Sequence, residues 1–491
     1  MKKMILCAAA LLFGVVVYGQ DIVGSPTSAL VPALPGAAIG ANTGESIQNG
    51  NDNKVRVRQA GTSQSVYTNQ NDGSGTGGNL AKVVQMGAVQ ATSGVENATD
   101  ILQSGSANQA QTRQEGDYNN AVTRQGQNND ASARNKAKIR QGTGNQAQDN
   151  RAAIDQDGDD NWAQTQQTYD NSDAWTRQIG TANKSMIVQD AGPNQTDGHE
   201  ANSYQSGNRN ESAISQSGAG ARNLAVLNQI GDDNQAKQMQ TTTAASGATG
   251  NRAGISQTFF GPITHAKNRA RGDIFSELDS AAGSAYHSSL SSFGARAKQT
   301  QNGEENEADI LQSGGLGIGD SNYAEQEQAS GASNIAGIEQ DWKGTSGENY
   351  AKQYQAGNDN RSALMQNGTG MKALQDQRGN SSDALSYQLG ENHLLNIHQR
   401  GDDNVAHSTQ HGSANAALMV QDGGHTYSVQ QNMGLSHSDF SAGGNQADIL
   451  QLGPNGDFAT DGIDCDFDNP MDLNMDYSIP DFDLGDVCPD C

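Results

Sequence analysis

The sequence predicts an all-β fold, a β-solenoid in which two short strands form each coil and successive coils stack into parallel sheets. The first observation is a fixed period: glutamines recur every eleven residues from Gln355 to Gln421, and glycines keep the same step from Gly357 to Gly423. A short period of this kind indicates one small unit stacked on copies of itself. The second is a strand-like alternation inside each unit, and the third is a composition rich in uncharged polar residues.

Each unit reads Asn-x-Ala-x-apolar-x-Gln-x-Gly. Clear copies occupy residues 79–87, 150–158, 223–231, 306–314 and 445–453. The marked residues alternate, so they share one face of a strand, which we expect to point inward. Glycine, often followed by aspartate, then predicts a turn. Two units of about seven strand and four turn residues make a flat coil of about 22 residues, in which inward Gln and Asn side chains form ladders from coil to coil.

Composition limits the alternatives. The 491-residue chain is 34% hydrophobic and 5% aromatic, which is too little apolar surface for several conventional cores. Charged residues make up only 17%, so the polarity comes mainly from amides, hydroxyls and glycine. The net charge of −25 argues against nucleic acid as the main ligand.

The first 19 residues have the pattern of a signal peptide. Lys2 and Lys3 precede an apolar run from Met4 to Val17. No other stretch is apolar enough to predict a membrane span. We therefore expect a secreted protein that is extracellular or attached to the cell surface.

The remaining chain divides into five parts. A flexible segment is predicted over 20–52, a repeat array over 53–257, a non-repeat insertion over 258–294, a second array over 295–453 and an acidic tail over 454–491. The insertion loses the Gln-x-Gly frame and contains aromatic residues such as Phe259 and Phe260. A docking loop is the alternative interpretation of that segment.

The repeat resembles that of the curlins, Gln-x-Gly-x-x-Asn-x-Ala-x-x-x-Gln. Residues 103–114 match it, as do 114–125, 156–167, 229–240, 399–410 and 410–421. Curlins are subunits of curli, the extracellular functional amyloid fibres of bacterial biofilms. The resemblance implies a solenoid that polymerises with copies of itself, after export through a curli-type pore and nucleation at the cell surface. Curlin subunits are usually far shorter, so the chain could serve as bulk subunit, nucleator or long adhesin.

The residues expected to carry this role form the ladder and the turns. They are Gln103, Gly105, Asn108, Ala110, Gln114, Gln229, Gly231, Asn234, Ala236, Gln355, Gly357, Gln366, Gly368, Gln399, Gly401, Asn404, Ala406, Gln410, Gly412, Asn415, Ala417 and Gln421.

The tail combines aspartates with three cysteines. The spacing Asp464-x-Asp466-x-Asp468 suits Ca²⁺, but the glycine and distal glutamate of an EF-hand are missing, so a solvated acidic tail is the preferred interpretation. In an exported chain, a disulfide among Cys465, Cys488 and Cys491 is favoured over a metal or redox site.

Other candidate sites are weaker. One arginine precedes the repeat Gln in several units, and we expect these arginines to fall in one outward column; they are Arg58, Arg113, Arg124, Arg140 and Arg177. A solubilising face is the preferred interpretation, and binding of anionic matrix polysaccharide or extracellular DNA is the alternative. A local histidine cluster is a poor candidate for a metal site; its members are His393, His398, His407 and His411.

No catalytic or cofactor-binding motif stands out, so we expect a structural protein with no cofactor rather than an enzyme. The leading interpretation is a curlin-like fibre subunit for cell adhesion and biofilm matrix. The alternative is a monomeric β-solenoid adhesin that binds glycan or another surface.

Overall fold

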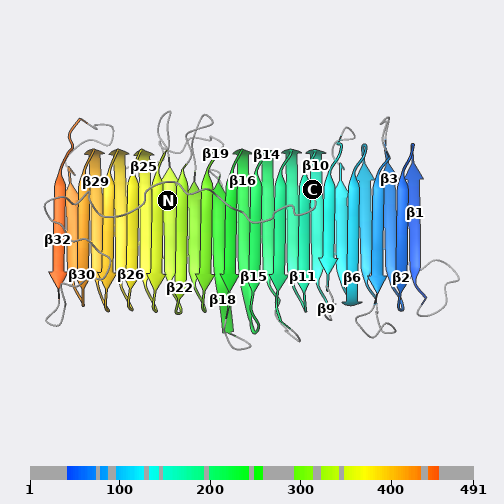
Figure 1. Ribbon diagram of the computed structural model, residues 1–491, viewed down its shortest axis with the longest axis horizontal. Coiled ribbons are helices and arrows are strands. Elements are labelled where there is room, and N and C mark those ends of the chain that lie inside the picture. The colour runs from blue at the N-terminus through cyan, green and yellow to red at the C-terminus, as the bar shows by residue number, and fades with distance from the viewer. Residues whose placement is uncertain are drawn as a thin grey trace, which may run out of the picture. The chain divides into compact units, whose positions relative to one another are not determined.

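The computed structural model describes residues 41–72, 78–86, 96–126, 132–142, 147–192, 198–242, 248–257, 292–312, 322–341, 348–432 and 441–452. The elements in these residues are all β-strands, as the repeat predicts. They form two compact units, one built mainly from residues up to Asn228 and one mainly from Gln229 onward. In each unit the strands stack in parallel (Figure 1).

In the first unit, alternate strands belong to two different sheets. The first sheet contains β1 (Thr43–Asn49), β3 (Ser65–Asn71), β5 (Ala98–Ser104), β7 (Asn120–Gln125), β10 (Arg151–Asp159), β12 (Asp173–Thr181), β14 (Glu200–Asn208) and β16 (Ala221–Asp232), whose last residues belong to the second unit. The second sheet contains β2 (Lys54–Ala60), β4 (Leu80–Met86), β6 (Gln109–Asp117), β8 (Lys136–Gln141), β11 (Trp162–Thr168), β13 (Lys184–Asp190) and β15 (Glu211–Ser217), with the short β9 (Ala147–Gln148) beside β6.

The second unit repeats this arrangement. Its first sheet contains β18 (Ala248–Gln257), β21 (Glu307–Gln312), β23 (Ile335–Asp341), β25 (Arg361–Thr369), β27 (Asp383–Glu391), β29 (Val405–Ser413) and β31 (Thr426–Gln431), and the short β19 (Ser292–Phe293) pairs with the end of β16. Its second sheet contains β17 (Gln235–Thr241), β20 (Arg296–Asn302), β22 (Tyr323–Ser330), β24 (Tyr350–Ala356), β26 (Lys372–Arg378), β28 (Leu394–Arg400), β30 (Ala416–Asp422) and β32 (Gln446–Leu452).

The parallel register places equivalent residues of successive coils on one another. Between β25 and β27, for example, Ser362 pairs with Ala384, Gln366 with Gln388, and Gly368 with Gly390. Strand pairing in register therefore turns the sequence period into columns of like side chains.

The length of a coil varies more than the length of its strands. Stacked glutamines are 22 residues apart at Gln355 and Gln377, as predicted, but 33 apart at Gln70 and Gln103. The largest steps, 55 and 61 residues, span the 258–294 segment. The extra residues lie in the turns, because lengthening a loop costs little free energy. One extra residue in a strand would instead turn the side chains that follow it to the wrong face.

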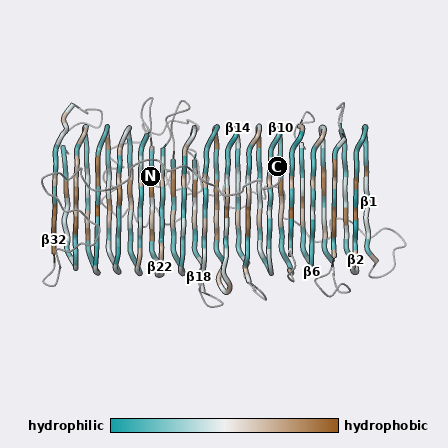
Figure 2. The backbone as a smooth tube through the Cα atoms, in the orientation of Figure 1, coloured by the Kyte–Doolittle hydropathy of each residue, from teal (hydrophilic) through white to brown (hydrophobic). Residues whose placement is uncertain are grey.

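The core is thin and lies between the two sheets. It consists of inward alanines and branched residues, such as Ala152, Ile154 and Ala163, which are fully buried. Figure 2 shows the polar and apolar residues mixed along every strand rather than gathered in one apolar layer. A small Ala at the second inward position allows the sheets to approach, and Ile or Val fills the width at the next.

The structure corrects one predicted boundary, and several predicted segments lie outside the described residues. The first strand, Thr43–Asn49, lies inside the segment predicted to be flexible, so the stack begins before residue 53. Residues 1–19, most of the 258–294 insertion and the 454–491 tail, with its cysteines and aspartates, lie outside the described residues. In the part of the chain that the structure describes, no helix has the length and hydropathy needed to cross a bilayer.

The turn glycines bring the backbones of neighbouring coils close together. Gly357 has a φ of 119°, and a Cβ built on it would lie 1.8 Å from the Gly379 carbonyl oxygen of the next coil. Gly423 has a φ of 94°, with nothing within 4 Å of such a Cβ. Both positions have a φ that is unfavourable for alanine, but only at Gly357 would the added Cβ also clash with the next coil.

We therefore expect Gly357→Ala to destabilise the coil by about 2 kcal/mol more than Gly423→Ala, because an overpacked backbone must move apart. Amide hydrogen exchange measures this difference, over β24 and β26 for Gly357→Ala and over β28 and β30 for Gly423→Ala. Equal effects of the two substitutions would show that the close approach is unimportant.

Candidate functional site: stacked amide ladders

The inward glutamines of the second unit form two side-chain ladders. In the second sheet, Gln355 donates through Nε2 to Oε1 of Gln377, Gln377 to Gln399, and Gln399 to Gln421, each at 2.9 Å. In the first sheet, Gln366, Gln388, Gln410 and Gln431 are joined in the same way over 2.8 to 3.0 Å. Every bond runs in the same direction along the chain, so each ladder is polar.

The first unit contains the same arrangement. Gln103 donates to Gln125 at 2.8 Å in the first sheet, and Gln114 donates to Gln141 at 2.9 Å in the second. At the start of the second unit, Gln229 donates to Gln257 at 2.7 Å. These glutamines are almost completely buried, so the ladder bonds form away from water.

The ladders also connect the two sheets, which sequence reasoning did not predict. The same Nε2 that continues the ladder donates to a backbone carbonyl of the facing sheet. Gln399 reaches the Asp383 oxygen at 3.0 Å, and Gln410 reaches the Leu394 oxygen at 3.0 Å. Each glutamine amide thus uses both of its hydrogens, one between coils and one between sheets.

The asparagines lie at the corners of the coils, where their side chains bond backbone groups as well as one another. Asn404 Nδ2 donates to the Arg400 oxygen at the end of the preceding strand, and its Oδ1 accepts the His425 N–H of the next coil at 3.1 Å. Asn108, Asn234 and Asn415 likewise accept a backbone N–H from the following coil. Each corner asparagine therefore fixes its own turn and the position of the next one.

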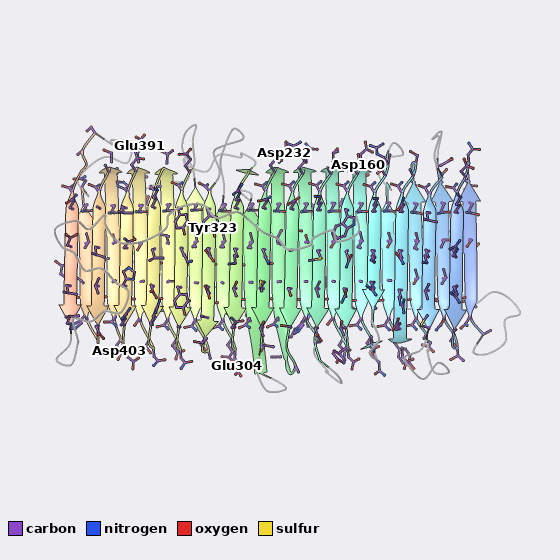
Figure 3. All side chains as sticks on the ribbon, viewed as in Figure 1. Asp160, Asp232, Glu304, Tyr323, Glu391 and Asp403 are labelled. Atoms are coloured by element: carbon purple, nitrogen blue, oxygen red, sulfur yellow. The ribbon has the colours of Figure 1, made fainter. Side chains whose placement is uncertain are left out.

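The residue before the corner has a left-handed backbone in most coils. Examples are Asp160, Asp233, Asp359 and Asp403, with φ between 55° and 60°. Aspartate tolerates this conformation better than most residues, which explains the Gly-x-Asp-Asn pattern. Figure 3 shows Asp160 and Asp403 at turns, whereas Tyr323 lies on the face of a strand.

The remaining residues of the predicted set occupy the interior and the turns. Ala110, Ala236, Ala406 and Ala417 are buried. The glycines of the set all have positive φ; they are Gly105, Gly231, Gly357, Gly368, Gly401 and Gly412.

Histidine replaces asparagine at some corners, as the repeat frame predicts for His393. His393 Nδ1 accepts the Asn415 N–H at 3.2 Å, and its Nε2 lies 3.0 Å from the Leu389 oxygen. A neutral imidazole with its proton on Nε2 reproduces the donor and acceptor of an asparagine amide. Burial lowers the pKa of His393 to about 4, and nearby His411 also lowers it. His199 occupies a similar corner, where burial lowers its pKa to about 4.

The single arginine column predicted from the sequence is wrong. Arg58, Arg113 and Arg140 lie on the second sheet of the first unit, whereas Arg124 and Arg177 lie on its first sheet. Successive repeats alternate between the sheets, so residues at the same place in the repeat divide into two columns.

The described residues contain no group of three or more His, Cys, Asp or Glu side chains arranged to hold a metal ion. No known family model matches the chain, and no curated protein was found to be similar to it. The ladder geometry itself is therefore the main guide to function.

Proposed function

We propose that this chain is a secreted structural subunit that stacks end to end into extracellular fibres of the curlin type, serving cell adhesion and biofilm matrix. The observation that carries the proposal is that inward positions lose their cover at the terminal coils. Val57 is 37% exposed, although its register partner Val83 is fully buried. Tyr427 is 38% exposed, although its partner Ala406 is fully buried.

The strands of these coils also have open edges. Within the described residues, β1 pairs only with β3 and β2 only with β4, while β31 pairs only with β29 and β32 only with β30. Unpaired backbone groups beside uncovered inward side chains form a template for another strand. A hollow at the last coil, lined by Tyr427, Val429, Gln431 and Ile449 among others, belongs to the same open face.

The polarity of the ladders makes the two ends complementary. At the first coil, Gln48 and Gln59 donate inward to Gln70 and Gln85, so their Oε1 atoms remain as acceptors. At the last coil, Gln431 and Gln451 are ladder acceptors. Gln431 and Gln451 each keep one Nε2 hydrogen that can be donated to the first coil of a second copy. Head-to-tail stacking of a second copy would continue both ladders in the same direction.

The curlin resemblance adds partners to this proposal, namely an export pore and a surface nucleator. The proposed role is structural rather than enzymatic, because the inward side chains of the described residues serve to pair successive coils. The uniform stack needs no cofactor for it.

The test compares growth at the open end of β31. Tyr427→Lys places a charge at an inward position of that end, and Thr426→Lys places the same charge on the outward position beside it. We expect wild type and Thr426→Lys to form seedable fibres with strong thioflavin fluorescence. For Tyr427→Lys we expect elongation at least tenfold slower, since burying an unpaired charge is strongly unfavourable.

Electron microscopy of the same samples identifies the product. A wild-type chain that stays monomeric under seeded conditions would overturn the proposal and favour the monomeric adhesin. Equal elongation of the two variants would show that fibres do not grow through this end.

A further inference from the structure

A cationic face stands out on this acidic protein. It lies on the outward side of the second sheet in the first unit, over strands β2 to β13. Parallel pairing aligns its side chains in rows along the stack. The rows are Lys54, Leu80, Gln109, Lys136, Trp162 and Lys184; Arg56, Lys82, Gln111, Lys138, Gln164 and Met186; and Arg58, Val84, Arg113, Arg140, Gln166 and Val188.

Few of these cations are neutralised. Arg113 pairs with Glu115, and Lys184 with Glu211. Lys54, Arg56, Arg58, Lys82, Lys138 and Arg140 form no ion pair within the described residues. By contrast, cations of the second unit sit beside acids, as Lys298 and Lys352 do on either side of Glu325. The face therefore keeps a local positive field despite the net charge of −25.

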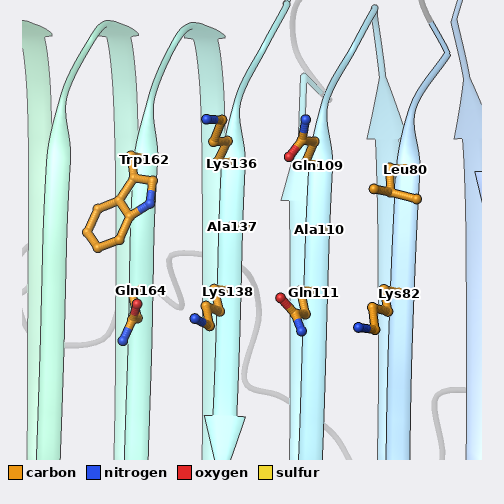
Figure 4. A pocket seen from close by; sticks show the side chains of 10 residues that line it. All are labelled: Leu80, Lys82, Gln109, Ala110, Gln111, Lys136, Ala137, Lys138, Trp162 and Gln164. Atoms are coloured by element: carbon orange, nitrogen blue, oxygen red, sulfur yellow. The ribbon is translucent and has the colours of Figure 1, made fainter. Parts of the chain in front are cut away.

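The face is also open and shallowly hollowed. A groove on it is lined by Lys82, Lys136, Lys138 and Trp162 together with Leu80 and three glutamines, and Figure 4 shows these side chains in two parallel rows across β4, β6, β8 and β11. Lys54, Lys136 and Lys184 are exposed. Successive positions along a row are about 4.8 Å apart. Amides, the indole and aliphatic side chains stand between most of the cations, and Arg56 and Lys82 are direct neighbours.

We propose that this face binds a linear anionic polysaccharide, lying along the stack with its carboxylates on the lysines and arginines. The amides of Gln109, Gln111 and Gln164 can donate to and accept from sugar hydroxyls. The Trp162 ring offers an apolar surface to one sugar ring. The site is complete in a single copy, so it extends the proposed extracellular role without requiring end-to-end stacking.

Single-stranded nucleic acid fits this face less well. Its binding surfaces combine a positive groove with several aromatic side chains on which successive bases stack. Among the outward residues of the second-sheet strands β2, β4, β6, β8, β11 and β13, Trp162 is the one aromatic side chain. Neutral side chains, Gln109 and Gln111 among them, dilute the cations here, which suits a hydroxyl-rich polymer of lower charge density.

The test uses polygalacturonate as the probe and its fully methyl-esterified form as the uncharged reference. Binding is measured on the full chain carrying Tyr427→Lys, so that assembly does not affect the result. The test variant carries Lys54→Gln, Lys82→Gln, Lys138→Gln and Arg140→Gln. The matched control removes the same charge from ion-paired positions, with Lys298→Gln, Lys352→Gln, Arg361→Gln and Arg378→Gln. Far-ultraviolet circular dichroism checks that both keep their β structure.

We expect the parent chain to bind polygalacturonate at least tenfold more tightly than the ester. The test variant should lose at least tenfold in affinity and have a shallower salt dependence, while the control should change less than threefold. Trp162→Ala should weaken binding with the salt dependence unchanged. No binding by the parent, or equal loss in the test and control variants, would overturn the proposal.

Single-stranded DNA of matched charge serves as the competing ligand. Tighter binding of this DNA than of polygalacturonate would overturn the assignment to polysaccharide. Fibre formation by the wild type is scored separately, so failure of either proposal leaves the other testable.

Discussion

Replacing Gln167 by leucine is expected to open the stack locally and to destabilise it by about 4 kcal/mol, because a buried donor or acceptor left without a partner costs about 1–3 kcal/mol. Gln167 Nε2 lies within hydrogen-bond distance of three acceptors that share its two hydrogens, the Arg151 and Ser172 oxygens at 2.9 and 2.7 Å and Gln189 Oε1 at 3.0 Å. Its own Oε1 accepts from Gln141. Leucine fills the space but satisfies none of these groups.

The matched control is Gln166→Leu, the same chemical change one residue earlier on the outward face of β11. It should alter local stability by less than 1 kcal/mol. Hydrogen exchange of amides in β8 and β13 is the suitable measurement, since repeat stacks open locally rather than in one two-state step. If the two variants exchange alike, the ladder contributes no more than an ordinary surface amide, and the argument for its structural role fails.

The second large effect is an acid sensitivity that depends on His393. Its pKa of about 4 in the folded chain lies below the ordinary value of 6.5, so the folded state favours the neutral ring. Its contribution to stability is complete above about pH 6.5 and is lost as the pH falls toward 4. At pH 4.5 the loss should reach about 2–3 kcal/mol, at 1.36 kcal/mol per pH unit.

The geometry explains the direction of this effect. A proton on Nδ1 would remove the acceptor of the Asn415 N–H and place a charge in a buried corner. Asn404 forms the equivalent bonds with a side chain that does not titrate. His393→Asn should therefore keep the corner at pH 7 and abolish this part of the acid sensitivity.

The comparison is made between wild type and His393→Asn, at pH 7 and pH 4.5, by hydrogen exchange over β28 and β30. Other titrating groups are common to both proteins. They include Asp100 and Asp155, whose carboxyl pKa values burial raises to about 6, so that acid acts on them in the stabilising direction. An unchanged pH response in the variant would show that His393 is not the sensitive group.

The fold could be predicted from the sequence because its period is short and strict. Gln355 to Gln421 keep one step, and parallel pairing converts that step into two columns of stacked amides, one on each sheet. The alternation within a unit decides which side chains face inward, and the Gly-x-Asp-Asn segments decide where the turns occur. These properties are local, so they can be read without knowing which coils meet.

The tertiary structure decided what depends on the pairing of distant units. The sequence does not show that Gln399 also bonds the facing sheet, or that coil lengths vary through their turns. It also suggested one arginine column, because residues at the same place in the repeat look equivalent until alternate units are assigned to different sheets. Only that assignment brings Lys82, Lys138 and Trp162 onto one face, since neighbours across a sheet lie a whole coil apart in the chain.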